Sequence, residues 1–315
     1  MIKKRIVIAL GGNAMLKRGE VLSAENQYKN IKTVSSLISQ LSDEYAITIV
    51  HGNGPQVGLL ALQDQAYAEV PSYPLDVLVA ETQGMIGYMI AQSLTQYGVK
   101  DVSCLLTRVS VDANDPAFED PTKFIGPVYA PSQQKALEQQ YGWQMKADGE
   151  YVRRVVASPF PQKVIEAKTI SHLLDNGELV VCCGGGGMPV VGENEKQTGV
   201  EAVIDKDLVA SMLAKQLKAD HLLILTDADA VYVDWGTVNQ RALRDVTSSQ
   251  MKPFAVPDGA MGPKAESVIS FVEATGNVAF IGALQDVEAI LAGEKGTCIR
   301  PELVISPAES DLLVH

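Results

Sequence analysis

The sequence has few histidines and cysteines, and neither residue occurs at the spacing of a metal site. There are four histidines and four cysteines, and no two cysteines form a C-x-x-C pair. Cys182 and Cys183 follow two valines in a predicted buried strand, so we interpret them as small core residues. This usage is typical of a reduced, cytosolic protein, and we expect a cytoplasmic location.

An excess of basic residues is also missing. Lys and Arg total 26 against 38 Asp and Glu, which gives a formal net charge of −12. A nucleic-acid-binding surface needs clustered Lys and Arg, so we expect no nucleic-acid partner. A small anionic substrate is still compatible with this charge, because it requires only a few lysines in one cleft.

Long hydrophobic runs are absent. No apolar stretch approaches the length of about 20 residues that a membrane-spanning helix needs, so we expect no membrane partner. The apolar run at residues 6–10 is too short for the core of a signal peptide and ends in Gly11-Gly12-Asn13.

Short apolar runs alternate with stretches of helical periodicity. We predict strands at residues 6–10, 46–50, 102–107, 179–183, 222–225, 278–281 and 297–299, and helices at residues 25–41, 55–68, 75–97, 163–175, 262–275 and 285–292. Alternating strands and helices predict βαβ units, and therefore an α/β fold with a parallel sheet covered on both faces.

Residues 112–162 interrupt this alternation. They are rich in proline, aspartate and glutamine, which is typical of a protruding insertion or lid. Within them, residues 143–146 and 151–156 flank the turn dipeptide Asp148-Gly149 and predict a hairpin.

Glycine-rich loops follow three of the predicted strands, at residues 11–13, 52–54 and 184–187. In an open parallel sheet, ligands bind beyond the carboxyl ends of the strands, and glycine lets backbone N–H groups approach an anion closely. Any one loop could be a tight turn, whereas three at strand ends favour an anion site. Gly52, Gly54 and Gly58 have the wrong spacing for a dinucleotide fingerprint, and the Walker and protein-kinase motifs are missing.

The segment at residues 199–208 combines an apolar run with Asp205-Lys206-Asp207 and leads into a helical pattern. Asp205 suits the N-cap position, but a cation at a helix N-terminus is locally unfavourable. Lys206 therefore indicates an anionic neighbour such as a phosphate. The alternative is a solvated surface cluster.

Two further lysines and two aspartates are candidates for the same site. Lys264 ends a glycine turn, residues 259–264, that leads into a predicted helix near Pro263, and Lys123 lies in the insertion; either could be a solvated lysine. Asp227 and Asp229 follow a strand and could orient a lysine, hold Mg²⁺ or cap the next turn. Several lysines beside glycine loops, without a nucleophile constellation, indicate phosphoryl transfer.

Eight motifs in collinear order resemble the carbamate kinase family, which has the amino-acid kinase fold. They are ALGGNA at 9–14, HGNGPQVG at 51–58, QGMIGY at 83–88, DPAF at 115–118, RRVV at 153–156, AVIDKD at 202–207, LTD at 225–227 and MGPK at 261–264. The resemblance covers about residues 5–300.

The resemblance implies a three-layer α/β/α sandwich with a mostly parallel eight-stranded sheet, and a homodimer. The chain would be one domain over residues 1–315, with residues 1–111 and 163–200 on the carbamate side, 112–162 as a protruding subdomain and 201–315 on the nucleotide side. The implied reaction is ATP + carbamate = ADP + carbamoyl phosphate with Mg²⁺, run toward ATP in arginine degradation.

The resemblance also implies roles for single residues. Lys206 would neutralise the transferring phosphoryl group, Asp207 would orient the lysines, and Lys123 would swing in with the subdomain to contact the substrate anion. The substrate and phosphates would be bound by Gly11, Gly12, Asn13, Gly52, Asn53, Gly54, Gly185 and Gly186, and the nucleotide by Asp227, Ala228, Tyr232, Met261, Gly262 and Lys264. No protein ligand to the metal is predicted. Phe124 stands where the family often has proline, which could alter how the subdomain closes.

Two alternatives stay open on the residues alone. One is a related small-molecule kinase of the same fold that acts on another carboxylate or a phosphonate, and a comparison of phosphoryl acceptors would separate it. The other is a non-catalytic nucleotide sensor, which any turnover would exclude.

Overall fold

In the described part of the chain, eight strands form the central sheet, in the order β15-β17-β16-β12-β1-β2-β9-β3. The structure is a computed structural model that describes residues 3–17, 19–67, 69–192, 196–256 and 261–302. The strands are β1 (Lys4–Leu10), β2 (Tyr45–His51), β3 (Val102–Cys104), β9 (Leu179–Val181), β12 (His221–Thr226), β15 (Asp245–Thr247), β16 (Val278–Ala283) and β17 (Thr297–Arg300). Neighbouring strands are parallel except β16 and β17, so the predicted mostly parallel eight-stranded sheet is confirmed.

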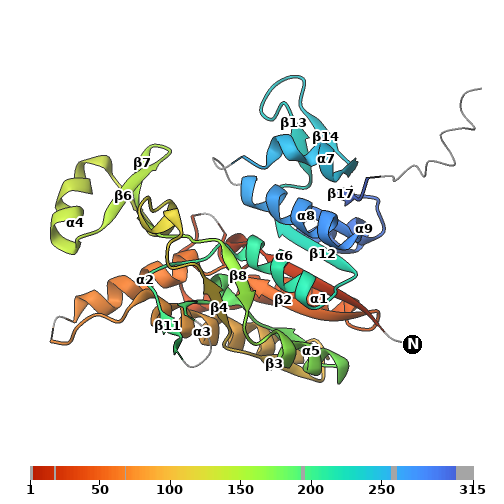
Figure 1. Cartoon of the computed structure of the whole chain (residues 1–315), viewed down its shortest axis with the longest axis horizontal. Coiled ribbons are helices and arrows are strands. Elements are labelled where there is room, and N and C mark those ends of the chain that lie inside the picture. Colours follow the sequence, from red (N-terminus) through yellow and green to blue (C-terminus); the bar gives the residue numbers. More distant parts are fainter. Residues whose placement is uncertain (1–2, 18, 68, 193–195, 257–260, 303–315) are drawn as a thin grey trace, which may run out of the picture.

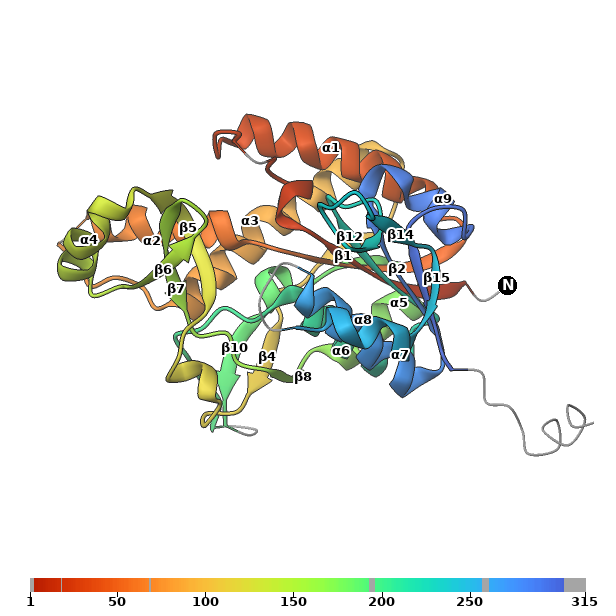
Figure 2. The ribbon, with the colours of Figure 1, turned by 90° about the horizontal axis from the view of Figure 1, so that it is seen from above.

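Helices cover both faces of this sheet (Figures 1 and 2). One face carries α1 (Ala24–Leu41), α3 (Leu75–Gln96) and α9 (Val287–Leu291), and the other carries α5 (Ala167–Asp175), α6 (Lys206–Gln216) and α8 (Gly262–Thr275). The alternation along β1 produces the two cores, because successive side chains of a strand point to opposite faces. Ile6, Ile8 and Leu10 enter the α1/α3 core, whereas Val7 and Ala9 enter the α6/α8 core.

The predicted helix at residues 163–175 is wrong at its start. Residues Pro161–Val164 form strand β8, which pairs antiparallel with β4 (Arg108–Val111), and the helix α5 begins only at Ala167. The pairing places Val164 opposite Val109, and both side chains are fully buried. With β10 (Met188–Val191) and β11 (Thr198–Gly199) these strands make a second sheet, and β8, β10 and β11 are not among the strands predicted from the sequence.

A protruding unit extends from the main body beside α2 (Gly54–Ala66) (Figure 1). It consists of β5 (Lys123–Tyr129), α4 (Gln134–Tyr141), β6 (Gln144–Asp148) and β7 (Tyr151–Val156), with sheet order β5-β7-β6. The predicted hairpin around Asp148-Gly149 is confirmed, since β6 and β7 pair antiparallel across it. Trp143, Met145 and Val152 give this unit a small core of its own.

The base of the protruding unit lies directly against α2. A Cβ built on Gly58 would be 2.0 Å from the Cα of Gly126, so the helix and β5 meet backbone to backbone. Any side chain at residue 58 would separate the two elements. On its other side, the chain leaving β7 bonds to the main body, where the N–H of Val203 donates to the carbonyl of Ala157 (2.9 Å).

Further short elements lie between β12 and α8 in the sequence, in addition to strand β15. A hairpin of β13 (Val231–Val233) and β14 (Arg241–Leu243) precedes the short helix α7 (Ser248–Met251). Among the described residues, no helix combines the length and the apolar character that a membrane span requires.

Candidate active site

The three glycine loops follow adjacent strands of the central sheet, at the side where the carboxyl ends of the parallel strands lie. The strands β1, β2 and β9 are neighbours, with β12 on the other side of β1, and all four are parallel. The first two loops each continue the ladder for one residue: the N–H of Gly11 donates to Leu225 O (3.1 Å) and that of Gly52 to Leu10 O (3.1 Å). The structure therefore brings the loops at residues 11–13, 52–54 and 184–187 together.

The second and third glycine loops pack closely on each other. A Cβ on Gly185 would lie 2.1 Å from Nδ2 of Asn53, and one on Gly184 would lie 2.4 Å from Nε2 of His51. Gly185 also has a φ of +65°, which side-chain-bearing residues rarely adopt. Asn53 is buried, and its Nδ2 donates to Oγ1 of Thr82 (2.8 Å). These contacts require glycine in the loop and hold Asn53 in one orientation.

A lysine–aspartate cluster stands where α6 and α8 begin. Asp207 accepts from Nζ of Lys206 at Oδ1 (2.9 Å) and from Nζ of Lys264 at Oδ2 (3.0 Å). The Asp207 side chain is 2% exposed, and those of Lys206 and Lys264 are 12% and 13% exposed. Two buried cations therefore share one buried carboxylate. Asp207 is therefore one anionic neighbour of the kind that the sequence predicts for Lys206.

Mutual attraction keeps the cluster ionised. Burial alone would raise the pKa of Asp207, but the charges of Lys206 and Lys264 lower it below its usual value. Burial alone would lower the pKa of Lys206, but Asp207 and Asp205 raise it. At neutral pH the Lys206 ammonium is therefore charged and lies beside the ionised carboxylate of Asp207. The cluster can thus present positive charge to an incoming anion.

The Lys206 side chain lies against the second glycine loop, where that loop approaches the first. A Cβ on Gly52 would be 3.3 Å from Cδ of Lys206 and 3.6 Å from the backbone N of Gly12. Among the described residues, no side chain caps the first turn of α2 after Asn53 or the first turn of α8. Uncapped helix N-termini and glycine N–H groups both attract anions. The predicted N-cap of α6 is confirmed, since Asp205 accepts from the N–H of Asp207 (2.8 Å).

The residues predicted to bind nucleotide fall into two groups. Asp227 follows β12 and lines a cavity of about 520 Å³ together with Gly11, and Met261 and Gly262 stand at the start of α8. A Cβ on Gly262 would be 1.8 Å from the carbonyl oxygen of Val256, so this position requires glycine. The predicted glycine turn at residues 259–264 lies partly outside the described residues.

Tyr232 belongs to the β13–β14 hairpin instead. Its hydroxyl donates to Oδ1 of Asp229 (2.7 Å), and its ring centroid is 5.1 Å from that of Trp235. Ala228 lies in the segment between β12 and this hairpin. The structure therefore joins Tyr232 to its own hairpin and not to the lysine cluster.

Sequence reasoning missed the second role of Asp205, which also binds Lys123. Nζ of Lys123 lies 2.5 Å from Oδ2 of Asp205, across 82 residues of sequence. No local pattern signals a contact at that separation. Thr82, the partner of Asn53, was missed for the same reason. His51 is the last residue of β2, and its Nδ1 donates to the carbonyl of Gly52 (2.9 Å).

His51 makes the stability of the fold depend on pH. Burial lowers its pKa to about 4, so the folded protein keeps this imidazole neutral while the unfolded chain protonates it near pH 6.5. Stability is therefore lost as pH falls from about 6.5 toward 4. We expect this residue to contribute about 3 kcal/mol of that loss. Urea unfolding of His51→Asn, which keeps a donor for Gly52, should show a correspondingly shallower pH dependence; an unchanged slope would contradict the assignment.

The chain is similar to known proteins over nearly its whole length. The model of the amino acid kinase family matches residues 4–282. The carbamate kinase of Escherichia coli O6:H1 is 58% identical over 297 residues, which cover 94% of this chain and 99% of the relative. The structure of carbamate kinase from Giardia lamblia bound to AMP-PNP has a TM-score of 0.86 at 38% identity, covering 95% of this chain and 99% of that one. The same enzyme bound to citric acid has a TM-score of 0.90 at equal identity and coverage. The chain therefore belongs to the amino acid kinase family, and within that family to the carbamate kinases.

Proposed function

We infer that this chain catalyses the reversible transfer of a phosphoryl group from ATP to carbamate, giving ADP and carbamoyl phosphate. The observation that carries this function is the pair of largely buried lysines on Asp207, one of which, Lys206, lies against the second glycine loop. The relatives with the same architecture, described above, are carbamate kinases.

Charge neutralisation is the main task of such a site. Both substrates are anions, and their approach costs Coulomb energy in a partly dry cleft. Lys206 and Lys264 offset that cost, and the backbone N–H groups of the glycine loops add fixed donors. A carbamate oxygen is already a competent nucleophile, so no general base is needed. Catalysis then rests on positioning and on stabilising the equatorial oxygens of the transferred group.

We assign the substrate anion and the transferred phosphoryl group to the loops of residues 11–13, 52–54 and 185–186, and the nucleotide to the residues after β12 and at the start of α8. Residues 1–111 and 163–200 would thus hold carbamate, and residues 201–315 would hold the nucleotide. Lys206 extends from one part to the loops of the other, which supports this division.

Mg²⁺ would enter with the nucleotide. Among the described residues, no group of three His, Cys, Asp or Glu side chains could hold a metal ion. Mg²⁺ commonly binds through phosphate oxygens and water with few protein ligands, and it neutralises phosphate charge. Both oxygens of Asp207 are occupied by lysines, so the cluster itself is not a metal site.

The function is tested by ATP formation from ADP, Mg²⁺ and carbamoyl phosphate, with acetyl phosphate as a parallel donor. Fast turnover with carbamoyl phosphate and little with acetyl phosphate is expected. The reverse preference, or turnover with neither donor, would overturn the proposed substrate. It would favour a different phosphoryl acceptor, as used by another kinase of the same fold. An isopentenyl phosphate kinase from T. acidophilum shares that fold at 16% identity and a TM-score of 0.54.

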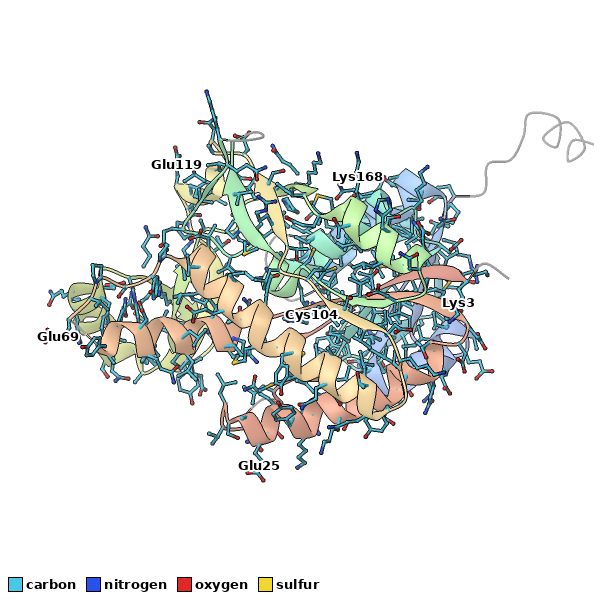
Figure 3. All side chains as sticks on the ribbon, turned by 90° about the horizontal axis from the view of Figure 1, so that it is seen from below. Lys3, Glu25, Glu69, Cys104, Glu119 and Lys168 are labelled. Atoms are coloured by element: carbon cyan, nitrogen blue, oxygen red, sulfur yellow. The ribbon has the colours of Figure 1, made fainter. Side chains whose placement is uncertain are left out.

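We further propose that the chain forms a homodimer through α3. Residues 77, 81, 84 and 88 are exposed and recur at helical spacing, which puts them on one face of this helix. Val77 and Tyr88 on this face are apolar and 37% and 57% exposed. Figure 3 shows α3 crossing its side of the molecule with α1 beside it and Cys104 near its middle.

Gly84 offers a sharp test of this dimer. A Cβ at Gly84 meets nothing within 4 Å, so the monomer tolerates a side chain there, and helix propensity favours arginine over glycine. We expect Gly84→Arg to convert the dimer to a monomer in sedimentation velocity without destabilising the fold of the subunit. Thr169→Arg, on exposed α5 across the sheet, is the matched control. An unaltered sedimentation coefficient for Gly84→Arg would exclude this face.

A further inference from the structure

Lys123 lies at the base of the protruding unit rather than at its far end. It is the first residue of β5 and pairs with Val156 of β7. The next residue, Ala157, bridges to Ala202, and its carbonyl accepts from the N–H of Val203. Two backbone pairings therefore connect Lys123 to the segment that enters α6. This position differs from a lysine that must swing in from a distance.

Asp205 divides its two carboxylate oxygens between separate tasks. Oδ1 accepts from the N–H of Asp207 and caps α6, while Oδ2 accepts from Nζ of Lys123 at 2.5 Å. The Asp205 side chain is 14% exposed and that of Lys123 is 29% exposed. Burial alone would raise the pKa of Asp205, but the charges of Lys123 and Lys206 lower it, so it is ionised at neutral pH. The helix that carries Lys206 and Asp207 is thus tied to the protruding unit through one side chain.

We propose that Asp205 is a positioning residue that holds the Lys123 ammonium beside the N-terminus of α6, ready for the substrate anion. An ammonium has three N–H donors, and Asp205 occupies one, so the others can meet a carbamate or phosphate oxygen. Asp205 does not touch the substrate; it acts through Lys123. This inference rests on the proposed function, in which Lys123 contacts the substrate anion.

Asp205→Asn separates the positioning role from the structural one. Asparagine caps helices as well as aspartate does, so its Oδ1 can still accept from residue 207. Its amide replaces the Oδ2 acceptor by a donor, which faces the Lys123 ammonium and cannot hold it. We expect the KM for carbamoyl phosphate to rise about tenfold, with the KM for ADP changed less than about twofold.

A double-mutant cycle connects the effect to Lys123. In the Lys123→Ala background, Asp205→Asn should no longer change the KM for carbamoyl phosphate, because the group that Asp205 positions is gone. Asp120→Asn is the matched control. It removes a similar ion pair, Lys146 Nζ to Asp120 Oδ1 at 2.7 Å, whose aspartate is 79% exposed, and should leave both KM values unchanged.

Hydrogen exchange tests the contact without any turnover. In the full-length protein without substrates, Asp205→Asn should increase amide exchange in residues 123–129, whereas Asp120→Asn should not. Equal exchange in wild type and Asp205→Asn, or additive effects on KM in the cycle, would overturn the proposal. If wild type fails to use carbamoyl phosphate, the proposed function fails, yet the exchange experiment still decides whether Asp205 holds β5.

Discussion

Lys206→Ala is expected to lose about a thousandfold in kcat while the fold stays intact, in the range found when one preorganised charge is removed from a phosphoryl-transfer site. The side chain of Lys206 lies against Gly52, and its ammonium shares Asp207 with Lys264. Removal takes away one of the cations assigned to the charge of the transition state. The KM for ADP should change little, because Lys206 is assigned to the transferring group. Steady-state ATP formation from carbamoyl phosphate measures both constants.

Lys215→Ala is the matched control for this variant. Lys215 belongs to the same helix, and its Nζ donates to Oγ of Ser270 (2.8 Å), far along α6 from the cluster. Its loss should leave kcat within about twofold, as for a residue outside the site. If Lys206→Ala retains near wild-type turnover, Lys206 has no part in the reaction. If both variants lose activity equally, the effect comes from α6 and not from the charge.

Asp207→Asn is expected to weaken the fold as well as the activity. Without the carboxylate, two buried ammonium groups face each other with no negative charge between them. Breaking a buried pair from one side typically costs about 3 kcal/mol of unfolding free energy. The pKa of Lys206 should also fall, since Asp207 is the main charge that raises it. Urea unfolding monitored by circular dichroism measures the loss.

Phosphate ligands should restore part of this stability. A bound nucleotide supplies the negative charge that Asp207→Asn lacks, and binding to the folded state alone stabilises it by mass action. We therefore expect ADP to raise the urea midpoint of the variant more than that of wild type. Asp245→Asn, which breaks the exposed pair with Arg300 (3.0 Å), should cost less than about 0.5 kcal/mol. Equal costs for the two variants would show that the buried cluster contributes no more than a surface pair.

The position of the candidate site was predictable because its glycine loops follow the ends of strands. Three glycine loops after short apolar runs had to meet at one edge of a parallel sheet, and β1, β2 and β9 are indeed neighbours. The start of α8 at Gly262 was predictable from Pro263, which suits the first helical turn. Local patterns of this kind depend on backbone preferences that a few residues determine.

Contacts between distant segments were not predictable. Lys264 is 57 residues from Asp207, and Lys123 is 82 residues from Asp205, so no local pattern pairs them. The role of Asp207 in orienting lysines came only from the family resemblance. The edge strand β8 was misread as helix because it has four residues, of which the two in the middle, Gln162 and Lys163, are polar and exposed. Such a short stretch does not display the apolar alternation of a strand. Its partner β4 likewise has only four residues.

The contact of Gly58 with Gly126 determines how the protruding unit can move. Two backbones that touch without side chains between them cannot approach further, so we expect any closing movement of the unit to be a rotation about this point. In such a rotation, displacement grows with distance from the pivot. Helix α4 at the far end would then travel furthest, whereas Lys123, three residues from Gly126, would stay almost still. Opening and closing of the protruding unit would regulate access to the site, while the Lys123 ammonium would keep its position at the reaction centre.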